Sequence, residues 1–129
     1  MLLDFIRGMK ILCFGNEFVE QDSLAKKLAD ELKVDGVEFI KCDALEGIKG
    51  DIIILDVVKG LNDVRLIPLE KIKDFHPVSL HDFDLGTELK LRKSIGEINK
   101  VTIFGIPMKG DKENIKQGII KLINDIRKE

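Results

Sequence analysis

The sequence predicts a single-domain α/β protein, doubly wound, with a mostly parallel sheet and helices on both faces. Short apolar runs alternate along the chain with segments of helical periodicity. The run from Ile52 to Leu55 is apolar at every position, as expected of a central strand buried on both faces. The length of 129 residues suits one domain, which we assign to residues 1–129. Residues 1–8 are expected to form a loose extension, because Met9 offers a second plausible start.

The first half of the chain contains three predicted strands and one helix. The strands are predicted at 11–14, 37–40 and 52–55. Gly15-Asn16 ends the first strand, and Asp56 closes the third. The helix is expected from about Ser23 to Leu32, since leucines recur on one face at helical spacing.

The second half predicts two strands and two helices. Residues 64–69 indicate a strand that Pro68 cuts short, and proline fits best at a sheet edge. A helix is expected from about Asp84 to Ile95, and a strand over 101–104 that Gly105 and Pro107 stop. The last helix, 112–127, has the clearest periodicity, carried by Ile115, Ile119, Leu122, Ile123 and Ile126.

Composition excludes several classes of function. The net charge of −2 and an aromatic content of 5% argue against nucleic-acid binding, which uses stacking aromatics beside a basic groove. The sequence shows neither a signal peptide nor a membrane span, so we expect a cytoplasmic protein without a membrane partner. Cys13 and Cys42 lack the spacing of a zinc site or a disulfide framework, and Cys13 is expected to be a buried core residue. The oligomeric state stays open.

Three polar residues follow predicted strand ends, where ligands bind in sheets of this kind. They are Asp22, Asp56 and His81. Two carboxylates and an imidazole could share a divalent transition metal and leave positions for water or substrate. Each residue also has an ordinary structural role. Asp22 could cap the helix that follows it, Asp56 could form a turn, and His81 could simply be solvated. The other histidine, His76, precedes Pro77 and is expected in a surface turn. Spacing alone favours these ordinary roles.

The same residues resemble the hydrogenase maturation endopeptidases, from Met9 to the final helix. The matching stretches are Gly15-Asn16 followed by Asp22, the run Ile52 to Leu55 closed by Asp56, Ser79-Leu80-His81 with Leu85, and Phe104-Gly105-Ile106-Pro107. Each motif alone is common. The three that contain Asp22, Asp56 and His81 occur in the family's order, and each supplies one metal ligand of the family. The sequence departs from the family pattern where Gln21 replaces an acid and Ser23 replaces glycine. It also has a shorter segment between Asp56 and His81.

The resemblance implies a function. In this family the enzyme removes a C-terminal extension from the large-subunit precursor of a NiFe hydrogenase after nickel has been inserted. Asp22, Asp56 and His81 would then be both the catalytic and the metal-binding residues. The metal would be nickel supplied by the substrate rather than a resident cofactor. The Gln21 departure puts in doubt any paired carboxylate that would activate water.

A receiver-like phosphoacceptor module is the alternative. Such domains have a similar length and a doubly wound sheet, and Asp56 would be the acceptor with Lys109 as its lysine. However, receivers carry paired acids directly after the first strand, where this chain has Gly15-Asn16. Their lysine also precedes a proline, whereas Lys109 comes after Pro107. This alternative gives no role to His81.

Overall fold

The computed structural model describes residues 8–16, 18, 19, 23–82 and 84–128, and gives only the backbone of residues 81 and 82. The expected loose extension lies outside these residues, apart from Gly8. The described strands are β1 (Met9–Cys13), β2 (Val37–Lys41), β3 (Gly50–Lys59), β4 (Arg65–Ile67), β5 (His76–Pro77) and β6 (Ile98–Pro107). They form one sheet in the order β2-β1-β3-β6-β4, and β5 pairs with β3 outside this path. The pairs β1–β2, β1–β3 and β3–β6 are parallel, while β4 and β5 run antiparallel to their neighbours. The predicted mostly parallel sheet is confirmed.

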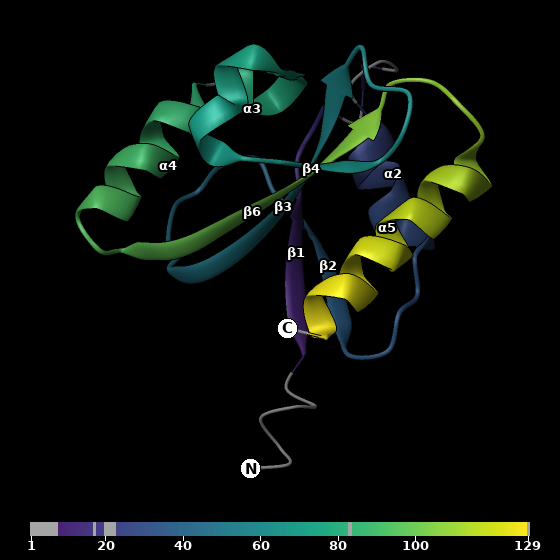
Figure 1. Ribbon diagram of the computed structural model, residues 1–129, viewed down its shortest axis with the longest axis horizontal. Helices are drawn as coiled ribbons and strands as arrows, with labels where there is room; N and C mark the ends of the chain where they lie inside the picture. The colour runs from purple at the N-terminus through teal and green to yellow at the C-terminus, as the bar shows by residue number, and fades with distance from the viewer. Residues whose placement is uncertain (1–7, 17, 20–22, 83, 129) are drawn as a thin grey trace.

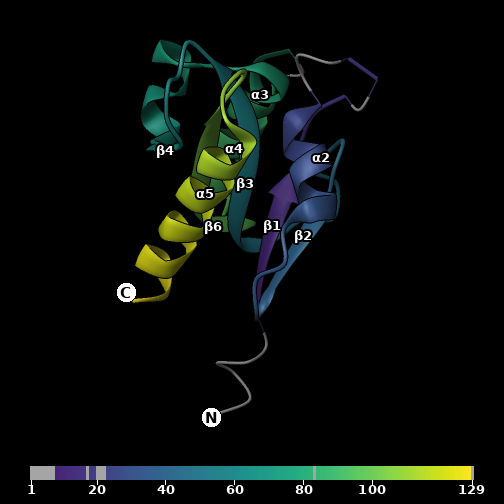
Figure 2. The ribbon, with the colours of Figure 1, turned by 90° about the vertical axis from the view of Figure 1, so that its right-hand side faces the viewer.

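Helices cover both faces of the sheet, as the sequence predicts (Figures 1 and 2). On one face lie α2 (Leu24–Glu31) and α5 (Lys112–Arg127). On the other lie the 3-10 helix η2 (Leu69–Asp74), α3 (Val78–Asp82) and α4 (Leu85–Ser94). Each face has its own hydrophobic core, so the sheet is buried between two layers of helices.

Strand β3 supplies side chains to both cores. Ile54 and Val58 pack toward α3 and α4, whereas Leu55 and Val57 pack toward α2 and α5. This division follows from the alternation of side chains along a strand. Asp56 belongs to the same set of alternate positions as Ile54 and Val58, so its carboxylate points toward α3 and α4.

Helix α5 begins and ends at the predicted residues. The Asp111 side chain accepts a hydrogen bond from the Glu113 N–H at 3.0 Å and so caps the helix start. Ile115, Ile119 and Ile123 are buried against the sheet. A capping aspartate and an apolar stripe therefore define this element without help from distant residues.

Two strands are longer than predicted. β3 continues through Asp56 to Lys59, and β6 continues through Gly105 to Pro107. Asp56 pairs with Gly105, and Val57 and Val58 pair with the two residues that follow Gly105. The predictions that Asp56 closes its strand and that Gly105 stops the other were therefore wrong. Asp56 is tolerated inside its strand because backbone N–H groups of α3 bind its carboxylate. Gly105 is tolerated because side chains of its neighbours fill the space that its own side chain would occupy.

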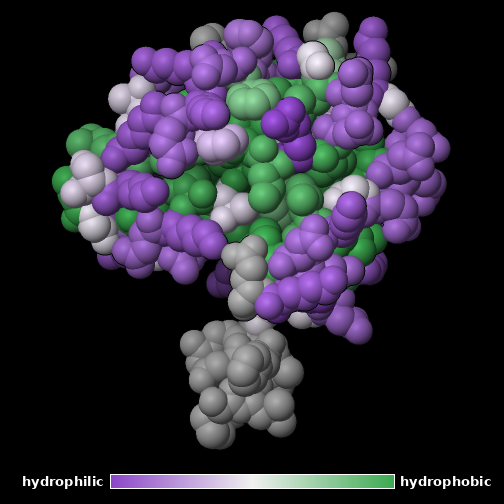
Figure 3. Space-filling view, viewed as in Figure 1, coloured by the Kyte–Doolittle hydropathy of each residue, from purple (hydrophilic) through white to green (hydrophobic). Residues whose placement is uncertain are grey.

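One edge of the sheet is only partly covered. β4 pairs with Ile103–Gly105 of β6, so residues 98–102 lie at an edge with no further partner among the described strands. β4 itself lies at the edge of the sheet and ends at Ile67, which confirms the prediction of an edge strand cut short by Pro68. In the space-filling view of this side, hydrophobic residues occupy the middle of the face between α4 and α5 (Figure 3). Leu66 of β4 is 46% exposed.

None of the described helices combines the length and the apolar character needed to cross a membrane.

Candidate functional site

The site lies where β3 changes its neighbour. On one side β3 pairs with β1 through Leu55, and from Val58 onward it pairs with β5. We call the stretch between these pairings, Asp56 and Val57, the switch point. The chain passes from β1 to β2 on one side and then crosses β1 to form β3 on the other. Ligands in doubly wound sheets bind beyond the strand ends at such a position.

Asp56 is the polar group at the switch point. It is 0% exposed. Its Oδ2 accepts a hydrogen bond from the Leu80 N–H at 3.0 Å, and its Oδ1 accepts a longer one from the Ser79 N–H at 3.4 Å. These N–H groups belong to the first turn of α3, where no preceding helical turn supplies acceptors. The carboxylate therefore fixes α3 to the sheet through charge-assisted bonds.

His81 lies on that same helix. It follows Leu80 directly, so the backbone that carries His81 is held to Asp56 across more than twenty residues of chain. The structure thus brings together Asp56 and the helix that carries His81. The His81 side chain is not among the described atoms, so the predicted contact with a metal stays a prediction.

Asp22 lies outside the described residues. Its neighbour Ser23 is buried and stands at the N-cap position of α2, with Leu24 as the first helical residue. The position that the sequence left open to Asp22 as a cap is therefore occupied by Ser23. The described side chains contain no group of three or more histidine, cysteine or acidic residues that could hold a metal. Of the three predicted ligands, Asp22 and the side chain of His81 lie outside the described atoms. The predicted metal site is therefore not tested by this finding.

The loop that leaves β1 presents an aromatic residue that the sequence patterns did not single out. The Asn16 Oδ1 accepts a hydrogen bond from the Phe18 N–H at 2.9 Å, and the Asn16 carbonyl accepts one from the Val19 N–H at 3.1 Å. This turn leaves Phe18 95% exposed. Exposed aromatic side chains are enriched in surfaces that bind other proteins. The exposure of Phe18 depends on the geometry of this turn. It could not be predicted from the presence of an apolar residue in a loop.

The two cysteines do not provide a nucleophile. Burial, with a smaller contribution from the nearby Cys42, raises the pKa of the Cys13 thiol to about 12. The pKa of Cys42 is also raised, mainly by burial and then by the charge of Asp43. Both cysteines are free thiols in the structure. Since the thiolate is the reactive form, neither thiol is suited to act as a nucleophile near neutral pH.

We expect the two thiols to differ in their reaction with Ellman's reagent. Cys13 is fully buried and should react only after unfolding, whereas the half-buried Cys42 should react slowly in the native protein. Absorbance of the released chromophore measures this directly. A Cys42→Ser variant should release almost none until denaturant is added, and rapid native-state reaction of that variant would contradict the assignment of Cys13 to the core.

His76 is exposed, as the sequence predicts, but it does not lie in the expected turn. It belongs to the two-residue strand β5 and pairs with Lys59 of β3. Lys109 is exposed beyond the end of β6. The four parallel strands, β2, β1, β3 and β6, follow the 2-1-3-4 part of the order found in flavodoxin-like and receiver sheets. The edge differs, because the antiparallel β4 lies where a fifth parallel strand would pair. The topology alone therefore does not decide on the receiver alternative.

Comparison with known proteins gives similarity at the level of structure. No protein-family model matches the sequence, and no curated protein matches it either. The NiFe hydrogenase maturation protease HybD from Thermococcus kodakarensis is 20% identical, with 93% of this chain and 99% of that chain covered and a TM-score of 0.61. The endopeptidase HycI from Escherichia coli is 19% identical, with 88% and 87% covered and a TM-score of 0.63. A hydrogenase 2 maturation peptidase from a Thaumarchaeota archaeon is 17% identical, with 92% and 97% covered and a TM-score of 0.55. The chain therefore has the fold of the hydrogenase maturation proteases.

Proposed function

We propose that this protein is an endopeptidase that removes the C-terminal extension from a nickel-loaded NiFe hydrogenase large-subunit precursor. Asp22, Asp56 and His81 would recognise the nickel of the precursor. The observation that carries the proposal is Asp56, a buried carboxylate at the switch point that is bonded to the helix bearing His81. The similarity of fold to solved maturation proteases, over most of both chains, supports the same class of substrate.

The donor types suit this task. Carboxylate and imidazole groups bind divalent transition metals such as nickel, and Cys13 lies in the core on the opposite face of the sheet from Asp56. A site of oxygen and nitrogen donors can therefore recognise a metal and release it. This agrees with nickel that belongs to the substrate and leaves with it.

The burial of Asp56 adds a requirement. Because the residue is fully buried, nickel reaches it only when docking of the precursor opens a path. We therefore propose that the isolated protein binds nickel ions weakly and that the loaded precursor is bound more tightly.

In this scheme, nickel positions the scissile peptide. A precursor without nickel lacks the group that the three residues recognise, so its extension is not aligned for hydrolysis. Water must lose a proton as it attacks the carbonyl, and the departing amine must gain one. A metal-bound carbonyl or water lowers the barrier to such an attack. The exposed Phe18 would contact the large precursor beside the site, and the protein would act in the cytoplasm.

The test is the intact mass of a precursor from the same organism, with and without nickel, before and after incubation with the protein. We expect loss of a C-terminal peptide from the nickel-loaded precursor only. The variants Asp22→Ala and His81→Ala should slow this loss by at least about 100-fold, since even partners outside a metal's direct ligands can matter by 10-fold to 100-fold.

Asp63→Ala is the matched control, because it removes an exposed carboxylate in the loop before β4. It should cleave at the wild-type rate. Cleavage that does not need nickel, or that survives in both ligand variants, would defeat the proposal. A persistent phosphate adduct after incubation with acetyl phosphate, lost in Asp56→Asn, would favour the receiver alternative instead.

A further inference from the structure

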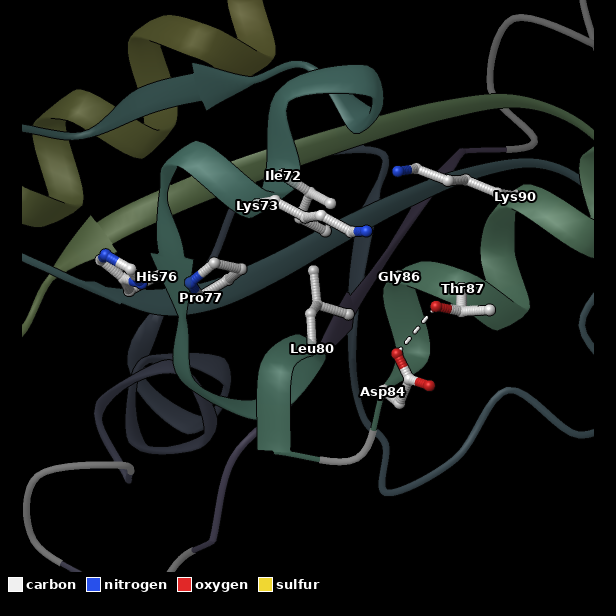
Figure 4. A pocket seen from close by; sticks show the side chains of 9 residues that line it. All are labelled: Ile72, Lys73, His76, Pro77, Leu80, Asp84, Gly86, Thr87 and Lys90. Atoms are coloured by element: carbon white, nitrogen blue, oxygen red, sulfur yellow. Dashed lines mark hydrogen bonds between the residues drawn. The ribbon is translucent and has the colours of Figure 1, made fainter.

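A pocket of about 510 Å³ lies between η2, β5, α3 and α4, on the face that Asp56 also points toward (Figure 4). Its apolar wall includes Ile72, Pro77 and Leu80, all of which are buried. Leu80 is the residue whose N–H binds Asp56. The pocket and the candidate site therefore share helix α3.

Two lysines stand at this pocket. Lys73 comes from η2 and Lys90 from α4, and both are exposed. Their side chains extend toward one another from opposite sides in Figure 4. Within the part of the chain that the structure describes, neither ammonium group has an ion-pair or hydrogen-bond partner. Other lysines do have one, as Lys116 shows with Glu31.

The acid at the pocket does not pair with these lysines. The Asp84 carboxylate accepts a hydrogen bond from the Thr87 hydroxyl at 2.8 Å, as the dashed line in Figure 4 shows. Among the described residues, the lining contains two lysines against one carboxylate, in a chain whose formal net charge is −2. A locally positive pocket on a negative protein attracts anionic groups selectively.

We propose that this pocket binds an acidic stretch of the polypeptide substrate, with its carboxylates at Lys73 and Lys90 and an apolar side chain against Leu80 and Pro77. This inference rests on the proposed function for the choice of a polypeptide. A small anion would use the ammonium groups but would leave the apolar wall uncovered. An acidic peptide matches both the charge and the wall, and its docking against α3 lies beside Asp56.

The probe is an octapeptide of alternating leucine and glutamate, acetylated and amidated at its ends, titrated into the ¹⁵N-labelled full-length protein. We expect the amide signals of Leu80, Gly86 and Thr87 to shift and the binding to weaken as ionic strength rises. Lys73→Gln and Lys90→Gln should each weaken binding about 3-fold to 5-fold, and the double variant about 10-fold, as expected of exposed charge pairs.

Lys93→Gln is the matched control, because Lys93 is an exposed lysine on α4 that does not line the pocket. It should bind the peptide as the wild type does. The inference would be overturned if Lys93→Gln weakened peptide binding as much as the pocket variants do, or if a leucine–glutamine peptide bound as tightly as the acidic one. Amide signals that shift only outside the pocket would overturn it as well. Free glutarate binding as tightly as the peptide would show a small-anion site and would also overturn it.

The titration involves no cleavage, so its failure is separate from a failure of the proposed function. If the precursor is cleaved in a nickel-dependent way, the double variant should raise KM and leave kcat close to the wild-type value. An unchanged KM would overturn the pocket's role while the endopeptidase assignment stood.

Discussion

Replacing Asp56 by alanine is expected to lower the free energy of unfolding by about 3 kcal/mol, because two buried N–H groups of α3 lose a charged acceptor. Asp56→Asn should lower the free energy of unfolding by about half as much. Its amide oxygen can still accept one of these bonds, but its NH₂ group is a donor and cannot accept the other. Urea unfolding followed by circular dichroism measures both values. A domain of this size has about 5–15 kcal/mol of stability, so both variants should remain folded.

Asp51→Asn is the control on the same strand. The Asp51 Oδ1 also accepts a backbone hydrogen bond, from the Lys100 N–H at 3.2 Å, but the residue is exposed. Water can replace that bond, so the loss should be within about 0.5 kcal/mol. If Asp56→Asn were as stable as Asp51→Asn, the anchoring of α3 by Asp56 would be wrong.

The same pair of variants separates structure from chemistry at the site. Asp56→Asn should retain its far-ultraviolet spectrum yet lose nickel-dependent cleavage by more than about 100-fold, because a neutral amide is a weaker metal ligand than a carboxylate. Full cleavage by folded Asp56→Asn would leave Asp56 with the anchoring role alone.

Gly105→Ala is expected to destabilise the protein by about 1 kcal/mol. A Cβ at Gly105 would lie 2.8 Å from Val58 Cγ2 and 2.9 Å from Ile67 Cγ1, and both neighbours are buried. Overpacking of this kind costs about 1–3 kcal/mol, which outweighs the gain of about 0.5–1 kcal/mol from replacing glycine inside a strand. Thermal and urea unfolding provide the measurement.

Gly86→Ala provides the matched comparison. Its added Cβ would meet Ile72 side-chain atoms at 3.4 Å, a far milder contact, and α4 would gain helix propensity of about 1 kcal/mol. Its stability should equal or exceed that of the wild type. The double variant Gly105→Ala/Val58→Ala should be more stable than the sum of its parts predicts, since removal of the Val58 methyl groups relieves one clash. Strict additivity would point to a cause other than this contact.

Much of the fold could be predicted because local patterns determine it. The bounds of α5 follow from the Asp111 cap and an isoleucine stripe, and the interruption at Pro68 correctly placed β4 at an edge. The errors lie at Asp56 and Gly105, where a polar or missing side chain looks like a strand end. Whether such a residue ends a strand depends on distant partners: the α3 amides for Asp56, and Val58 and Ile67 for Gly105.

The site was predictable only in part. The rule that ligands gather at strand ends led to Asp56, and the motif around Ser79 led to the helix that binds it. The place of Asp22, the side chain of His81 and the metal-binding role of Asp56 remain predictions. The pocket had no sequence signal, because Lys73 and Lys90 come from different elements and lysines of that spacing are common on any surface.

The strand order has a consequence for the order in which the chain can be assembled. The switch point needs β1 beside β3, and β3 beside β6, although long stretches of sequence separate the members of each pair. Contacts of this kind close long loops before they yield stabilisation, so they form late compared with helices such as α2. The surroundings of Asp56 are therefore completed only when nearly the whole chain has been synthesised. A nascent or truncated chain would have the residues of the site without the site itself.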